Sequence, residues 1–276
     1  MAIGDITLSS AARSNLAALT STTSLLAQTQ SHLSTGKTVN SASDNATAYF
    51  ASKGFLNSAN NLNIVKNNLS TALEAVNSFD NSISDVTSVI VQLQGVATQA
   101  LGTTDTTTRK GLASQFNALT TQLNELVNDA TFNGTNLLNS ATASLVVYFN
   151  ETNTTSLTIT GVNVTSAGLL TSSGNTASSS WAGATDIQTS QSFLLSALST
   201  LRTDAANFGG NATLIQTRQD FTTNLITSLQ NASNDLVQAD TNVEGANLQA
   251  LQAQDQLGIV SLGVSGTLEQ AILKIL

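Results

Sequence analysis

The stretch from Leu62 to Ala100 constrains the fold more than any other part of the chain, because apolar residues recur in it with an unbroken three-four spacing. We call these residues the central seam: Leu62, Val65, Leu69, Ala72, Val76, Phe79, Ile83, Val86, Ile90, Leu93, Ala97 and Ala100. Such spacing keeps one apolar stripe of a helix turned towards a partner helix. At 1.5 Å per residue this helix would be about 58 Å long, which indicates a rod rather than an ordinary amphipathic helix of a globular bundle.

Weaker patterns of the same kind predict further helices on both sides of the central seam. Leu16, Leu19, Leu26 and Leu33 predict a first helix that ends near Gly36, and Thr23 and Gln30 fill the alternate positions of its stripe. A second helix is expected to start around Ser43 or Asp44 and to run into the central seam. Asp105 can cap a third helix, whose apolar residues run from Leu112 to Ala130.

Helical periodicity returns after residue 185 and continues towards the end of the sequence. It starts with Ile187, is expected to break at Gly209-Gly210, and resumes at Leu214. The last segment contains Gly245, Gly258, Gly263 and Gly266, and each glycine costs about 1 kcal/mol relative to alanine inside a helix. We therefore expect the final 30 or so residues to need partners before they become ordered.

Between the two helical parts lies a segment of different composition. Leu145–Phe149 and Ser156–Thr160 are rich in β-forming residues and predict a hairpin, and Ser166–Gly183 is expected to form loops. The predicted fold class is thus mainly α, a long coiled-coil-like helical rod with a small β-hairpin insert. Its expected parts are an N-terminal assembly helix (1–43), central helices (44–139), an outer insert (140–184), returning helices (185–236) and a C-terminal assembly helix (237–276).

The composition argues against several classes of function. The net charge is −8 and the nine basic residues are scattered, which does not suit nucleic acid. Without cysteine there is no thiol chemistry, and a single histidine cannot build a zinc site of the His-Glu-x-x-His type. The first 16 residues lack the apolar core of a signal peptide, and polar residues interrupt the apolar run 257–276, so no membrane span is expected. Composition alone would suggest a cytoplasmic protein.

No pattern of residues points to catalysis. A Ser-His-Asp triad is formally possible, but His32 is better explained as an exposed or packing residue. Asp240 and Glu244 lie four residues apart on one helix face, yet nothing in the sequence indicates a pocket beside them. They form either a contact surface or a solvated face. We therefore predict no enzyme activity, no cofactor and no metal.

Several motifs, in one order, resemble those of bacterial flagellins. Leu33–Ala46 is similar to the loop after the first flagellin helix, and Thr131–Leu138 to the turn that leads into the hairpin. Asp240, Glu244, Asn247 and the residues up to Gly258 match the C-terminal pattern of the family. The resemblance covers residues 1–139 and 185–276.

The resemblance implies a structural subunit of the extracellular flagellar filament, used for motility and polymerising through its terminal helices with copies of itself. Export without a cleaved signal peptide, through the flagellar type III apparatus and with a chaperone, would replace the cytoplasmic assignment. Hook-associated and cap proteins are the other expected partners. The residues expected in assembly are Leu16, Leu19, Leu26, Leu33, Asn40, Asp44, Asp240, Glu244, Asn247, Leu257, Val264, Leu268, Ile272 and Ile275.

Two alternatives stay open at this point. A hook-filament junction protein shares such terminal helices, although the match at the C-terminus favours a filament subunit. A soluble helical-bundle enzyme or ligand-binding protein would need a concave site with convergent polar groups, for which the sequence offers no candidate.

Overall fold

A computed structural model describes residues 10–170 and 176–275, apart from the side chains of Ser178, Ser179, Glu269 and residues 272–275. These residues are mainly α-helical with one small antiparallel sheet, which confirms the predicted fold class. The chain divides into two compact units. The terminal unit joins residues 1–58 with residues 228–276, and the central unit is residues 59–227.

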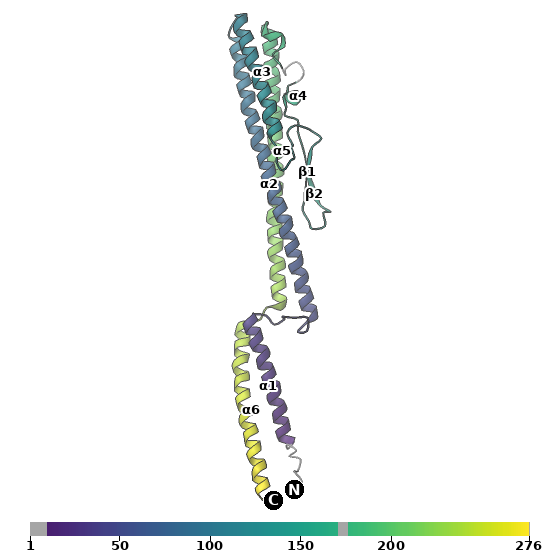
Figure 1. The fold of residues 1–276 in the computed structure, drawn as a ribbon, viewed down its shortest axis with the longest axis vertical. Coiled ribbons are helices and arrows are strands. Elements are labelled where there is room, and N and C mark those ends of the chain that lie inside the picture. Colours follow the sequence, from purple (N-terminus) through teal and green to yellow (C-terminus); the bar gives the residue numbers. More distant parts are fainter. Residues whose placement is uncertain (1–9, 171–175, 276) are drawn as a thin grey trace. The chain divides into compact units, whose positions relative to one another are not determined.

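Three helices, α2 (Ala46–Leu101), α3 (Thr106–Asp129) and α5 (Ala184–Val237), form the core of the central unit, where they lie side by side (Figure 1). The central seam is buried from Val65 to Ala100, and Leu62 is half-buried. The seam packs against apolar residues of the neighbouring helices; for example, the rings of Phe79 and Phe208 have centroids 6.3 Å apart. Full burial of such a side chain contributes about 1.5–3 kcal/mol, so this stripe accounts for a large part of the stability of the unit.

The turn between α2 and α3 is fixed by one cap and one buried cation. Asp105 caps α3 as expected, since its carboxylate accepts a hydrogen bond of 2.7 Å from the backbone amide of Thr108. The Arg109 guanidinium is buried, and its Nε donates to the carbonyl oxygens of Ala100 at 3.2 Å and Thr103 at 2.8 Å. These carbonyl groups belong to the end of α2 and the turn after it, so Arg109 closes the connection.

The insert carries the predicted hairpin. Strand β1 (Ser144–Tyr148) pairs antiparallel with β2 (Ser156–Thr160), and Val147 and Ile159 are its buried residues. The expectation of loops throughout Ser166–Gly183 is wrong for part of this segment. It contains a short helix α4 (Ser166–Leu169) and a 3-10 turn η1 (Ser178–Trp181). The residues were difficult to predict because Trp181 takes its position from a distant contact, with its ring centroid 4.9 Å from that of Phe116.

The predicted break at Gly209-Gly210 is also wrong, because α5 continues through both residues. Neither glycine has an atom within 4 Å of the position where a Cβ would stand, so both lie on the open side of the helix. On its other side Phe208 and Ile215 are buried in the core. Burial of these neighbours offsets the roughly 1 kcal/mol that each glycine costs the helix.

In the terminal unit, α1 (Ser10–Thr35) and α6 (Thr241–Ile275) lie along each other (Figure 1). The loop between α1 and α2 is tied to the chain that leads into α6. Thr38 donates its amide to the carbonyl of Val237 at 2.8 Å, and Ala239 donates to that of Gly36 at 2.9 Å. Gly36 has a φ of +67°, which glycine adopts without strain. Helix α6 continues through all four of its glycines.

Candidate assembly surface

Polar side chains provide the specific contacts between α1 and α6. Asn15 donates from Nδ2 to Ser261 Oγ at 3.0 Å and to Ser265 Oγ at 3.2 Å. Further along, Thr23 Oγ1 donates to Asp255 Oδ1 at 3.5 Å. Residue numbers fall on α6 as they rise on α1, so the two helices are antiparallel. A neutral hydrogen bond such as those of Asn15 contributes only about 0.5–1.5 kcal/mol.

The side of α1 that faces α6 agrees with the predicted stripe at Leu19, Leu26 and Leu33, and it differs from the prediction at the positions between these leucines. Among the described α1 residues, the fully buried ones are Ala12 and Thr29, whereas Gln30, which was assigned to the stripe, is exposed. The residues that are at least half-buried along this side repeat with a 4-3 spacing: Asn15, Leu19, Thr22, Leu26, Thr29 and Leu33. The apolar pattern missed the other positions of this side because they are Asn or Thr. A search that also accepted small polar residues at heptad spacing would have found them.

The apolar stripe of α6 is largely exposed. The stripe that contacts α1 includes Glu244, Asp255, Gly258 and Ser265, and none of the described α6 side chains is fully buried. Large apolar side chains lie beside that stripe and are open to solvent; Leu257 is 69% exposed. We call the exposed apolar residues of the two helices the terminal apolar surface: Leu16, Leu25, Val243, Leu257, Ile259, Val260, Val264 and Leu268.

The residues expected in assembly fall into three groups. Leu19, Leu26, Leu33 and Glu244 are half-buried between the helices. Exposed residues are Leu16, Asn40, Asp44, Asp240, Asn247, Leu257, Val264 and Leu268. The side chains of Ile272 and Ile275 lie outside the described residues. Sequence reasoning did not find Asn15, Ser261 and Ser265, which connect the two helices.

The two family-like aspartates stabilise their own segments. Asp44 accepts hydrogen bonds of 2.9 Å from the amides of Asn40 and Ser41, which closes the loop before α2. These bonds, the one from Asn40 first, lower the pKa of Asp44 from its usual value of 3.8. Asp240 accepts from the amides of Asn242 at 2.9 Å and Val243 at 3.2 Å, so it caps α6. His32, expected to be a plain exposed or packing residue, lies with Nδ1 2.9 Å from Glu244 Oε1.

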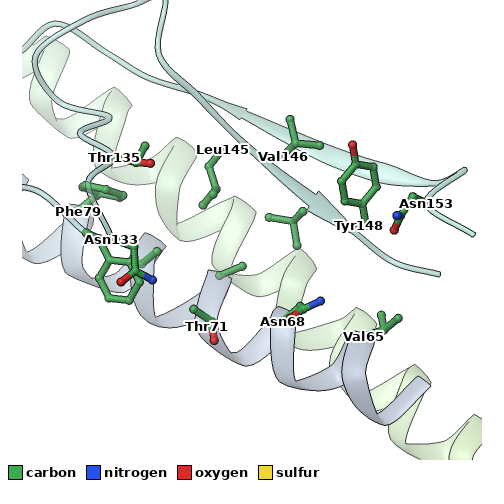
Figure 2. A pocket seen from close by; sticks show the side chains of 14 residues that line it. Val65, Asn68, Thr71, Phe79, Asn133, Thr135, Leu145, Val146, Tyr148 and Asn153 are labelled. Carbon is green, nitrogen blue, oxygen red and sulfur yellow. The ribbon is translucent and has the colours of Figure 1, made fainter. Parts of the chain in front are cut away.

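A cavity of about 390 Å³ lies in the central unit between α2 and the hairpin (Figure 2). Its apolar walls include Val65, Phe79 and Val147, and Asn68 and Asn153 are among its polar residues. The residues that line it include no Asp, Glu, His, Lys or Arg, and Tyr148 is the titratable side chain among them. Among the residues that the structure describes, no cluster of three or more His, Cys, Asp or Glu side chains could hold a metal ion.

No helix in the described part of the chain is both long enough and apolar enough to cross a bilayer.

Paired terminal helices with an exposed apolar stripe are typical of the class of structural proteins that assemble with other chains. The family model for the "bacterial flagellin N-terminal helical region" matches residues 6–143. Flagellin FljN of Caulobacter vibrioides is 31% identical, with 100% of this chain and 99% of that protein covered. The flagellin of Brucella melitensis is 28% identical over 99% of both chains. The chain belongs to the bacterial flagellin family and is a filament subunit.

Among solved structures, the chain is similar to a flagellin from another bacterium. The crystal structure of Bacillus cereus flagellin is 18% identical and covers 56% of this chain and 88% of its own, with a TM-score of 0.48.

Proposed function

We propose that the chain polymerises into an extracellular flagellar filament through its terminal unit, with neighbouring copies covering the terminal apolar surface. The observation that carries this proposal is the exposed stripe Leu257, Val260, Val264 and Leu268, which repeats every three or four residues beside the α1 contact of α6. Four apolar side chains on one face of one helix would be unfavourable in contact with water. Burial of the stripe by other copies of the chain removes this cost. Membership of the flagellin family supports such copies, rather than a different protein, as the partner.

The energetics connect order to assembly. Fixing the backbone of one residue costs about 1–2 kcal/mol, and the α1–α6 pair has few buried side chains to offset that cost. Each large apolar side chain that a neighbour buries contributes about 1.5–3 kcal/mol. The terminal unit therefore gains most of its stability when several copies surround it. On this proposal, the final 30 or so residues become fully ordered only in the filament.

The remaining partners follow from membership of the family. They are the flagellar export apparatus and a chaperone, with passage out of the cell without a cleaved signal peptide, and then hook-associated and cap proteins at the filament ends. We further propose that the chain has no catalytic, cofactor or metal site and does not bind nucleic acid. We also propose five parts of the chain. They are an N-terminal assembly helix (1–43), central helices (44–139), an outer insert (140–184), returning helices (185–236) and a C-terminal assembly helix (237–276). A hook-filament junction protein and a soluble enzyme are not favoured by relatives that are named flagellins.

A double substitution, Leu257→Asp with Val264→Asp, tests the proposal. Both side chains are exposed, so the variant should keep the helical circular dichroism of the parent monomer. It should fail to elongate filament seeds, because assembly would bury two unpaired charges at a cost of several kcal/mol. The matched control is Gln256→Asp with Gln270→Asp, which adds the same charge at exposed polar positions of α6.

Electron microscopy and light scattering at a series of monomer concentrations give the critical concentration of each variant. If the Leu257 and Val264 variant elongates seeds at the critical concentration of the parent, the terminal apolar surface is not the contact. A parent chain that stays monomeric with seeds would instead support a soluble binding protein.

A further inference from the structure

The single histidine of the chain forms a hydrogen bond across the α1–α6 contact, which becomes an ion pair when the ring is protonated. His32 Nδ1 lies 2.9 Å from Glu244 Oε1, and the two side chains are only 14% and 13% exposed. Because a carboxylate can only accept, Nδ1 must carry the proton of this hydrogen bond. When Nε2 is protonated as well, the ring is a cation and the contact becomes a charge-assisted one.

The positions of both groups along their helices favour the charged forms. His32 is in the last turn of α1, where the carbonyl ends of the helix attract a cation. Glu244 is in the first turn of α6, where the amide ends attract an anion. The antiparallel pairing brings these two helix ends together, so the helix dipoles and the charges of the two side chains both favour the contact.

Other charged groups near the contact belong to the loop and to the chain before α6. The charge of His32 contributes to the lowered pKa of Asp44, after the larger effect of the backbone hydrogen bonds from Asn40 and Ser41. Asp240 caps α6 one turn before Glu244 and is already bonded to two backbone amides. The remaining charged groups of these segments are Lys37 in the loop, which is exposed, and Asp235 near the end of α5, also exposed.

The other contacts between α1 and α6 do not titrate near neutral pH. Asn15, Ser261 and Ser265 are neutral at any physiological pH, and the remaining described contact joins the Thr23 hydroxyl to the Asp255 carboxylate. Among the side chains in the described contacts between α1 and α6, His32 is the one whose residue type can change its charge between pH 5 and 8.

We propose that His32 and Glu244 form a pH-sensitive latch, which holds the ends of α1 and α6 together when the imidazole is protonated and loosens when it is neutral. The latch itself is a property of the single chain, and its effect on filaments rests on the proposed assembly through the terminal unit. The direction follows from the pair. The attraction requires the imidazolium and the carboxylate together, so it is lost when the imidazole gives up its second proton. In the neutral ring, the Nδ1–H group still donates to Glu244 but carries no charge.

Hydrogen exchange of the α1 and α6 amides in the monomer tests the latch directly. After correction for intrinsic exchange, the opening constant of the parent should be larger at pH 8.5 than at pH 5.5 by up to about fivefold, the upper end of the range for an exposed ion pair. His32→Arg keeps a permanent cation, so it should remove this change and stay closed at both pH values. His32→Gln and Glu244→Gln should also show no change, but at the more open level.

Three results would overturn the proposal. They are a pH profile of His32→Gln that matches the parent, a profile of His32→Arg that matches the parent, and no protection of α1 and α6 in the parent at pH 5.5. The critical concentration for seeded growth, measured on the same four proteins, should follow the opening constants. If exchange shows the latch but no protein elongates seeds, the latch stands and the proposed function fails.

Discussion

Leu19 and Gly258 meet across the α1–α6 pair, because a methyl group added to Gly258 would stand 3.0 Å from Leu19 Cδ1. The absence of a side chain at Gly258 lets α1 approach closely at this point. Gly245, Gly263 and Gly266 are different, since nothing lies within 4 Å of their missing Cβ atoms. The four glycines of α6 look alike in the sequence, but only Gly258 makes room for the partner helix.

This difference predicts unequal outcomes for two equivalent substitutions. Gly263→Ala should stabilise α6 by about 0.5–1 kcal/mol, because alanine has less backbone freedom to lose and the added methyl has space. Gly258→Ala should stabilise it less or not at all, since Leu19 must move by a few tenths of an ångström. Hydrogen exchange of α6 in the monomer measures both effects. Equal protection in the two variants would show that α1 does not approach Gly258 closely.

Ile83→Asp should destabilise the central unit strongly. Ile83 is 1% exposed within the central seam, and an unpaired carboxylate there costs several kcal/mol. We expect the thermal midpoint of the helical circular dichroism to fall well below that of the parent. Ser84→Asp is the matched control, because Ser84 is the next residue of α2 and is exposed. Equal midpoints for Ile83→Asp and the parent would mean that this side of α2 faces no partner.

Trp181 offers a direct optical probe of the insert, since it is the single tryptophan of the chain and is fully buried. Its ring packs on Phe116, and its Nε1 donates to Ser190 Oγ at 3.3 Å. Phe116→Ala should cost about 3–5 kcal/mol and shift the tryptophan emission to longer wavelength as water reaches the indole. The control Gln115→Ala, at the neighbouring exposed position, should change neither the stability nor the emission wavelength. An unchanged emission spectrum in Phe116→Ala would contradict the contact.

Much of the central unit could be predicted from the sequence because its helices pack through apolar side chains, and apolar spacing reports directly on such packing. The break expected at Gly209-Gly210 shows the limit of local preference. Two glycines weaken a helix by an amount that burial of Phe208 and Ile215 can exceed. The position of Trp181 was equally hidden, since its partner Phe116 is distant in the sequence.

The candidate site was harder to predict because the contact between α1 and α6 follows the predicted apolar stripe of α1 only at Leu19, Leu26 and Leu33. Asn15 donates hydrogen bonds to α6 and Thr29 is buried on the same side of α1, and neither residue has a hydrophobic signal. The apolar stripe of α6 that includes Leu257 is left exposed instead. Sequence periodicity identifies a surface that is suited to burial, but it does not say whether the same chain or another one covers it.

The last prediction concerns Asp204, a largely buried carboxylate of α5 that lies one turn from both Leu201 and Phe208. Burial raises the pKa of Asp204 above its usual 3.8, and within the described part of the chain no hydrogen bond or ion pair reaches its carboxylate. A raised pKa means that the folded chain favours the protonated acid. Ionisation therefore destabilises the folded state, and this loss of stability develops as the pH rises from about 3.8 through the folded-state pKa.

Asp204→Asn keeps the shape of the side chain and removes its charge, so it should stabilise the central unit at pH 7 and have little effect near pH 3. For a chain of this size we expect the thermal midpoint at pH 7 to rise by up to about 3 °C. Asp220→Asn removes the same charge from an exposed position of α5 and controls for the net charge of the chain. Thermal unfolding of the three proteins at pH 3 and pH 7 decides the matter. A midpoint of Asp204→Asn at pH 7 that is no higher than that of Asp220→Asn would show that the buried charge is compensated and that its ionisation does not weaken the fold.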